Sequence, residues 1–172
     1  MNTTASQLYK KISKYDNLVS QEIINKAYVL SKKAHLNQYR CSGEEYFTHP
    51  LAVANFLVEM KLDSSTIITA LLHDVVEDSE IRIQNISDEF GIEISRLVDG
   101  VTKLSKLDLK FGFAQAENFR KLLLASSDDI RVLLVKLADR LHNIRTIDGI
   151  KNDEKRSRIC YETLEIFAPL AE

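Results

Sequence analysis

The chain has 172 residues, of which 45% are hydrophobic and 28% charged, as in a soluble globular domain with a substantial core. A net charge of −2 without a basic tract argues against DNA or RNA binding. No apolar run approaches the roughly 20 residues that a membrane span needs, and no signal-peptide layout is present. Two scattered cysteines do not suggest a disulfide framework, so we expect a reducing, cytoplasmic setting.

The first half of the chain is predicted to be helical. Only two prolines and five glycines occur in the whole chain, and no segment sustains the alternation of a strand. Ser20 is a suitable N-cap, Pro50 fits the first turn of a helix, and Ser64 or Ser65 is expected to cap another. The expected helices cover residues 20–35, 50–60 and 65–78, after a first helix over residues 5–14.

The second half continues this pattern around one long loop at residues 104–114. Gly91 follows a short helix that ends at Phe90 and favours a left-handed conformation there. Residues 126–129 resemble a capping box. Further helices are expected at residues 93–101, 116–124, 130–147 and 153–167, the last ended by Pro169. The sequence therefore predicts an all-α fold, a compact bundle of about eight to nine helices in one domain over residues 1–172.

A polar stripe interrupts the apolar run at residues 69–78. On a continuous helix His73 would share a face with Glu77, and Asp74 with Asp78, because residues four apart are neighbours. Leucines and valines cover most of the remaining circumference, which places this helix in the core. Half-buried carboxylates beside a histidine need a partner, and a cation is the common one.

A second stripe lies in the predicted helix 130–147. Leu134, Leu137, Leu141 and Ile144 have helical spacing and are expected to face the core. Asp139, Asn143 and Thr146 follow at i, i+4 and i+7 on a neighbouring face. Bundles commonly build metal sites from side chains of facing helices, so Asp139 is expected to meet the first stripe.

A metal site is predicted where the two stripes meet. Its candidate ligands are His49, His73, Asp74 and Asp139. Two imidazoles and two carboxylates suit divalent Mn, Fe, Co or Zn better than Ca or Mg. Such an ion can lower the pKa of bound water and polarise a phosphoryl oxygen. Glu77 and Asp78 are placed to orient or deprotonate that water and to move its proton.

The order of these residues resembles that of the HD-domain phosphohydrolases. More specifically, the chain resembles the alarmone-hydrolase domain of the RelA/SpoT homologue family over about residues 27–171. The matching segments are residues 40–43, 46, 49–54, 71–78, 100–104, 116–121 and 136–143.

The resemblance implies a Mn²⁺-dependent hydrolase of the stringent response. It would remove the 3′-diphosphate of guanosine tetraphosphate (ppGpp) or pentaphosphate (pppGpp), giving GDP or GTP and diphosphate. The four candidate ligands would hold the metal, and the two further acids would serve the attacking water. Arg40 would stack on or flank the guanine, and Ser42 would line its pocket. Asn143 and Thr146 would contact the base or sugar.

Three loop positions depart from the family pattern. Cys41 replaces the usual lysine, which should weaken contact with base or phosphate. Asn37 stands where glycine is usual and Glu45 where proline is common, and neither change touches a ligand. Because all metal and catalytic positions are intact, we expect hydrolysis to be active.

Other interpretations stay open at this stage. The chain could be an HD phosphohydrolase of another nucleotide, or a module that binds the alarmone without hydrolysing it. His35 and His142 are better candidates for supporting the ligands than for ligation, with His142 expected to fix a carboxylate. Longer family members continue into a synthetase domain, so none is expected within these residues. The sequence does not decide between a stand-alone protein, a split gene and a piece of a longer one, or the oligomeric state.

Overall fold

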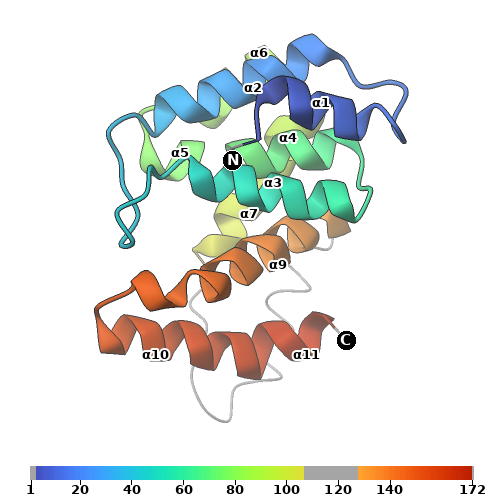
Figure 1. Ribbon diagram of the computed structural model, residues 1–172. Coiled ribbons are helices and arrows are strands. Elements are labelled where there is room, and N and C mark those ends of the chain that lie inside the picture. Colours follow the sequence, from blue (N-terminus) through green and yellow to red (C-terminus); the bar gives the residue numbers. More distant parts are fainter. Residues whose placement is uncertain (1–2, 107–127, 172) are drawn as a thin grey trace.

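A computed structural model describes residues 3–106 and 128–171 as an arrangement of helices (Figure 1). Within these ranges no β-strand occurs, and the only strand-like pairing is an isolated antiparallel bridge between Tyr39 and Glu45. The predicted all-α class is therefore confirmed. The expected helix 116–124 and most of the expected loop 104–114 lie outside the described residues.

The N-terminal helices follow the predicted order. Their bounds are α1 Ala5–Ile12, α2 Gln21–Ala34, α3 Thr48–Glu59, α4 Ser64–Leu72, α5 Val75–Asp78, α6 Ile83–Phe90 and α7 Ile92–Ser105. Ser20 caps α2 as predicted, and Pro50 lies in the first turn of α3. The expected cap of α4 was wrong: Asp63 takes this role, because its carboxylate accepts hydrogen bonds from both the backbone N–H and the hydroxyl of Thr66.

The C-terminal helices differ from the prediction at their ends: α9 stops two residues early, whereas the last helix continues past residue 167. They are α9 Ile130–Arg145, the 3₁₀ turn η1 Ile147–Gly149, α10 Asp153–Glu162, the π-helical turn η2 Thr163–Phe167 and α11 Ala168–Ala171. Asp129 caps α9, while residues 126 and 127 of the expected capping box lie outside the described residues. Pro169 does not end the last helix but lies within α11, directly after the wider π-helical turn.

Gly91 joins α6 to α7 with φ of 86° and ψ of 169°. The positive φ was predicted, but the ψ is extended rather than left-handed helical, so α7 begins at the very next residue. α7 also continues to Ser105, and the first two residues of the expected irregular stretch are therefore helical.

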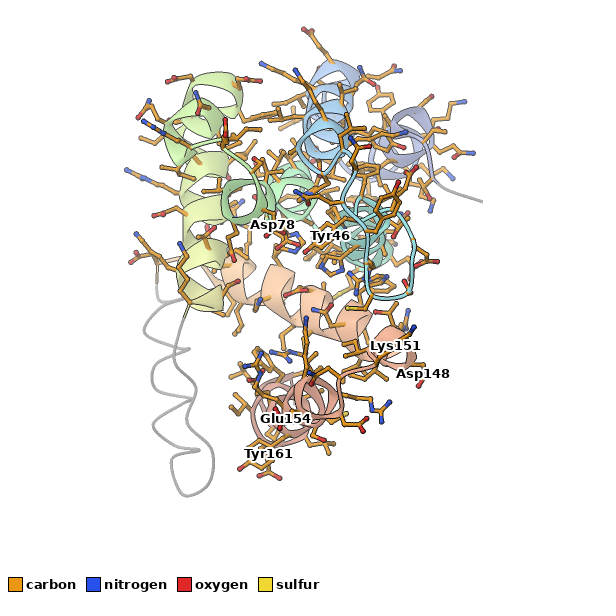
Figure 2. All side chains as sticks on the ribbon, turned by 90° about the vertical axis from the view of Figure 1, so that its left-hand side faces the viewer. Tyr46, Asp78, Asp148, Lys151, Glu154 and Tyr161 are labelled. Atoms are coloured by element: carbon orange, nitrogen blue, oxygen red, sulfur yellow. The ribbon has the colours of Figure 1, made fainter. Side chains whose placement is uncertain are left out.

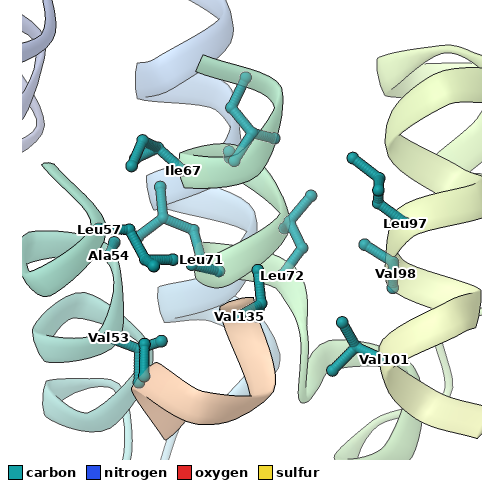
Figure 3. Packing of buried hydrophobic residues seen from close by; sticks show 14 of the residues in the cluster. Val53, Ala54, Leu57, Ile67, Leu71, Leu72, Leu97, Val98, Val101 and Val135 are labelled. Atoms are coloured by element: carbon teal, nitrogen blue, oxygen red, sulfur yellow. The ribbon is translucent and has the colours of Figure 1, made fainter. Parts of the chain in front are cut away.

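The core lies between α3, α4 and α7, with α1 and α2 covering one side (Figure 1). α9 crosses beneath α3, α4 and α7, and α10 with its continuation packs on the far side of α9. Figure 3 shows Leu57 of α3, Leu71 and Leu72 of α4, Val98 of α7 and Val135 of α9 meeting in this core.

The predicted core face of α9 was wrong for three of its four residues. Leu141 is 42% exposed and Leu134 and Ile144 are only partly buried, whereas Leu137, also partly buried, packs against the core. The buried side chains of this helix are Val132, Leu133, Val135, Ala138 and Asp139. The leucines misled the prediction because α9 is covered on two sides, by the core and by the C-terminal helices. As a result Asp139 lies on the core face itself.

Gly100 sets the close approach of α7 to α9. A Cβ atom at this position would lie 2.7 Å from Cγ2 of Val132, a buried β-branched side chain that has little freedom to turn away. We expect Gly100→Ala to lower the free energy of unfolding less in a Val132→Ala background than in the wild type. The difference between the two effects should be about 1–2 kcal/mol. Urea unfolding of the four proteins measures this, and equal effects in both backgrounds would contradict the close contact.

Candidate functional site

The first polar stripe lies at a helix junction rather than on one continuous helix. α4 ends at Leu72 and α5 begins at Val75, so the expected stacking along a single straight helix was wrong. His73 and Asp74 form the junction. In a regular helix adjacent side chains diverge by about 100°. Here the junction brings His73 Nε2 within 3.2 Å of Asp74 Oδ1.

The structure brings the four predicted ligands together from three parts of the chain. His49 comes from the first turn of α3, and its Nε2 lies 3.1 Å from Asp139 Oδ1 and 3.6 Å from Asp74 Oδ2. Donor atoms of His49, His73 and Asp74 all lie within 4.8 Å of one another, a spacing that suits a shared metal ion. Asp139 adjoins these three residues through its contact with Nε2 of His49.

His73 fits a ligand role particularly well. Its Nδ1 lies 2.7 Å from the carbonyl oxygen of Ala70, so the ring donates its proton there. In the neutral form of this ring, Nε2 carries the lone pair. Nε2 is buried and has no hydrogen-bond partner among the described residues, because its approach to Asp74 lacks hydrogen-bond geometry. A buried lone pair beside a carboxylate is the arrangement that a divalent cation satisfies.

His49 is held as a neutral imidazole. Burial lowers its pKa, and the opposing effects of Asp139 and Asp74 do not overcome this. A neutral ring is the form that can ligate a metal. The other nitrogen, Nδ1, lies 2.8 Å from Nδ1 of His142. The expectation that His142 fixes a carboxylate was therefore wrong, because its partner is an imidazole.

Asp139 is buried and ionised. Burial by itself raises its pKa, but the ammonium of Lys136 and the contact with His49 hold the pKa well below its usual range. Lys136 Nζ lies 2.7 Å from Oδ2 and also donates to Ser105, while Asn143 donates to Oδ1 at 2.7 Å. Burial disfavours the charge of Lys136, yet Asp139 outweighs it and the pKa of Lys136 is raised. Lys136 and Asp139, three residues apart on α9, thus form a buried ion pair.

Tyr46 supports Asp74, a role that the sequence interpretation missed. Its hydroxyl donates to Asp74 Oδ2 at 2.9 Å, and its ring stacks on His35 with centroids 4.7 Å apart. Burial and the charges of Asp74 and Asp78 raise the pKa of Tyr46 far above its usual value, so the hydroxyl stays a donor. Figure 2 shows Tyr46 and Asp78 on the side of the upper helices that faces α9. The sequence signals were its position three residues before His49 and its place among the positions that match the family.

Glu77 and Asp78 form the solvent-exposed end of the site on α5. The pKa of Glu77 is raised, first by partial burial and then by the negative charge of Asp74. A more basic carboxylate at the mouth of the cluster is suited to accept a proton. The α5 turn is tied down because Gln38 donates to the backbone oxygen of Asp78 at 2.9 Å.

The four predicted substrate contacts line one cavity of about 330 Å³. They are Arg40, Ser42, Asn143 and Thr146. Arg40 Nη2 donates to Asn143 Oδ1 at 3.2 Å and to Thr146 Oγ1 at 2.9 Å. Tyr46 and Asn143 line the cavity. Tyr46 also hydrogen-bonds Asp74, and Asn143 hydrogen-bonds Asp139, so the cavity adjoins the group of four candidate ligands.

The loop that carries Arg40 and Ser42 is closed by its own backbone. Arg40 N–H donates to the Glu44 carbonyl, Gly43 N–H donates to the Arg40 carbonyl, and Gly43 has a φ of 89°. Asn37 has a φ of 62°, which asparagine tolerates better than most residues and which accounts for the glycine usual there. The family departure at Asn37 is thus compatible with the same backbone.

The sequence profile of the HD domain family matches residues 27–172, which include every residue of the cluster and the cavity. The chain belongs to the HD domain family.

Relatives of this HD domain agree with the predicted resemblance. "GTP pyrophosphokinase rsh" of Brucella melitensis is 54% identical over 166 residues, which are 96% of this chain and 22% of the relative. "Bifunctional (p)ppGpp synthase/hydrolase SpoT" of Escherichia coli K12 is 52% identical over 149 residues, which are 86% of this chain and 21% of that protein. The chain thus spans about a fifth of the length of these relatives. The likeness to the hydrolase domain of the RelA/SpoT homologues is confirmed.

A solved structure shares the fold of this HD domain. It is described as a metazoan orthologue of SpoT that hydrolyses ppGpp and plays a role in starvation responses. It is 25% identical, covers 86% of this chain and 84% of its own, and has a TM-score of 0.69. Among the described residues, none of the helices has both the length and the apolar character to cross a membrane.

Removing one carboxylate charge tests whether the four candidate ligands form a metal site. We expect Asp74→Asn to weaken binding of a divalent cation at least tenfold, since supporting residues alone typically change metal affinity by about 10- to 100-fold. Isothermal titration with Mn²⁺ measures this, with Glu80→Gln as an exposed control for the loss of a nearby negative charge. Unchanged affinity in Asp74→Asn, with circular dichroism showing a folded protein, would contradict the assignment.

Proposed function

We propose that this HD domain hydrolyses the 3′-diphosphate of ppGpp and pppGpp to GDP or GTP and diphosphate in the stringent response. The observation that carries the proposal is the shared wall between the cluster and the cavity, made by Tyr46 and Asn143. A nucleotide seated in the cavity would present a phosphate to the ionisable groups beside it. The SpoT relative and the metazoan orthologue support the same chemistry by their described activities.

The charge of the cavity suits an anionic nucleotide. Arg40 and Lys155 line it, and no carboxylate does among the described residues. Asn143 and Thr146 hold the Arg40 guanidinium from one edge, which leaves its plane able to stack on a purine. The volume of about 330 Å³ is within the range of small-molecule sites.

His49, His73, Asp74 and Asp139 would hold a divalent cation, which we propose to be Mn²⁺. The mixture of imidazole and carboxylate donors supports a transition metal over Ca²⁺ or Mg²⁺, and the family resemblance supports manganese among these. When bound, the cation supplies Lewis-acid chemistry, acidifying water and polarising a phosphoryl oxygen.

The protein's own acids would move the protons. Glu77, with its raised pKa, would accept a proton from the attacking water, and exposed Asp78 would pass it to solvent. The water oxygen would bond to the phosphorus that carries the 3′ oxygen. The bond between this phosphorus and the 3′ oxygen would break, and the 3′ oxygen would take up a proton. Tyr46 would keep Asp74 oriented throughout through its hydroxyl hydrogen bond.

The remaining features of the proposal follow from this chemistry. The substrate is a small nucleotide rather than a nucleic acid, in keeping with the net charge of −2. Residues 1–172 would act as one hydrolase domain, in the cytoplasm where guanine nucleotides are present. The pyrophosphokinase name of the Brucella relative belongs to a protein of which this chain matches only 22%.

Release of diphosphate from ppGpp tests the proposed reaction. With Mn²⁺, the wild-type protein should turn over ppGpp, and Glu77→Gln should lower kcat by about 100-fold or more because a proton acceptor is lost. Metal affinity should change little, and Glu80→Gln serves as the matched control.

Three results would contradict parts of this proposal. Faster turnover of other nucleotides in a competitive panel would indicate a different HD phosphohydrolase. Binding of ppGpp without diphosphate release under any divalent metal would indicate a binding module. Normal turnover in Glu77→Gln would overturn the proton-transfer role.

Cys41 offers a gain-of-affinity test because it is exposed on the cavity wall where the family has lysine. Cys41→Lys should lower the KM for ppGpp by about three- to tenfold, corresponding to the roughly 1 kcal/mol expected of a partly solvated ion pair. Cys41→Met is the matched control, since it adds length without charge. A KM that is unchanged or higher in the lysine variant, at equal kcat, would contradict a phosphate or base contact at this position.

A further inference from the structure

Two histidine rings meet edge to edge beside the candidate metal cluster. Nδ1 of His49 and Nδ1 of His142 are 2.8 Å apart, and the ring centroids are separated by 4.9 Å. At this distance one hydrogen atom lies between the nitrogens, so one ring donates and the other accepts. The direction of this bond decides which nitrogen of His49 has a free lone pair.

The surroundings of His49 fix that direction when a cation is bound. Its Nε2 points to Asp139 and Asp74 at 3.1 and 3.6 Å, so Nε2 is the atom available for ligation. A neutral imidazole carries one proton, and ligation through Nε2 leaves this proton on Nδ1. Nδ1 of His142 must then be the acceptor.

We propose that His142 is a positioning residue for the metal site: its Nδ1 accepts the proton of His49 Nδ1 and so keeps His49 in the ligating tautomer. This inference rests on the metal site of the proposed function. His73 obtains the same help from a permanent acceptor, the carbonyl oxygen of Ala70. His49 instead relies on a side chain.

α9 orients the His49 ring from both of its nitrogens. Asp139 lies at Nε2, and His142, three residues later on the same helix, lies at Nδ1. Residues three apart share a helix face, so a single helix supplies both contacts. Phe56 of α3 packs near the His142 ring, with centroids 6.2 Å apart, and restricts its movement. The acceptor is therefore held beside the ligand that it supports by its own helix and by a ring contact with α3.

Substitution of His142 separates an acceptor role from a packing role. Asparagine can place its Oδ1 near the position of the imidazole Nδ1 and accept the same hydrogen bond, whereas leucine cannot. We expect His142→Leu to weaken Mn²⁺ binding by about 10- to 100-fold and His142→Asn by no more than about threefold. Leu141→Ala, at the exposed neighbouring position, should leave the affinity unchanged.

Nitrogen NMR gives a second, independent readout. In the Zn²⁺-loaded wild-type protein, which lacks paramagnetic broadening, His49 should show a protonated Nδ1 and an unprotonated Nε2. His142 should show the opposite tautomer.

Each outcome decides the proposal. Wild-type affinity in His142→Leu, an equal loss in His142→Asn and His142→Leu, or a protonated His142 Nδ1 facing His49 would overturn it. A wild-type protein that binds neither Mn²⁺ nor Zn²⁺ would overturn both this inference and the metal site. If metal binding depends on His142 as expected but ppGpp is not hydrolysed, the proposed function alone fails.

Discussion

The buried charge of Asp139 is the constraint on which the site depends. A carboxylate at the core face of a helical bundle is costly unless its oxygens are satisfied. Lys136 and Asn143 donate to these oxygens, each at 2.7 Å, and Nε2 of His49 lies 3.1 Å from Oδ1. Since Lys136 also donates to Ser105 of α7, the compensation of one charge joins α3, α7 and α9. The neutralisation of Asp139 thus ties α9 to α7 and to α3, the helix that carries His49.

Each candidate ligand has a partner that fixes its orientation. The carbonyl of Ala70 sets the tautomer of His73, and the Tyr46 hydroxyl orients Asp74. Such outer contacts determine how well a site holds its ion, because a ligand that turns freely loses entropy on binding. The break between α4 and α5 is part of the same arrangement, since it turns two adjacent side chains toward one point.

Sequence patterns predicted the cluster better than they predicted the helices around it. His49, His73, Asp74 and Asp139 could be named because their types and order resemble a known family, and the structure brings them together. The helix break could not be predicted, because the apolar run on both sides has uninterrupted helical spacing. The core face of α9 was wrong for a related reason: a helix covered on two sides carries apolar residues around most of its surface, and periodicity no longer identifies the inner face. Tyr46 was missed because its role depends on a contact 28 residues away.

Asn143 links the two halves of the site through one amide group. Its Nδ2 donates to Asp139, and its Oδ1 accepts from Arg40. Only one orientation of the amide satisfies both contacts, because a carboxylate cannot donate and a guanidinium cannot accept. An aspartate at this position would repel Asp139, and a leucine would leave Asp139 and Arg40 each short of a partner. The amide is therefore specific: the group that hydrogen-bonds the candidate metal ligand Asp139 also orients the guanidinium of Arg40 on the cavity wall.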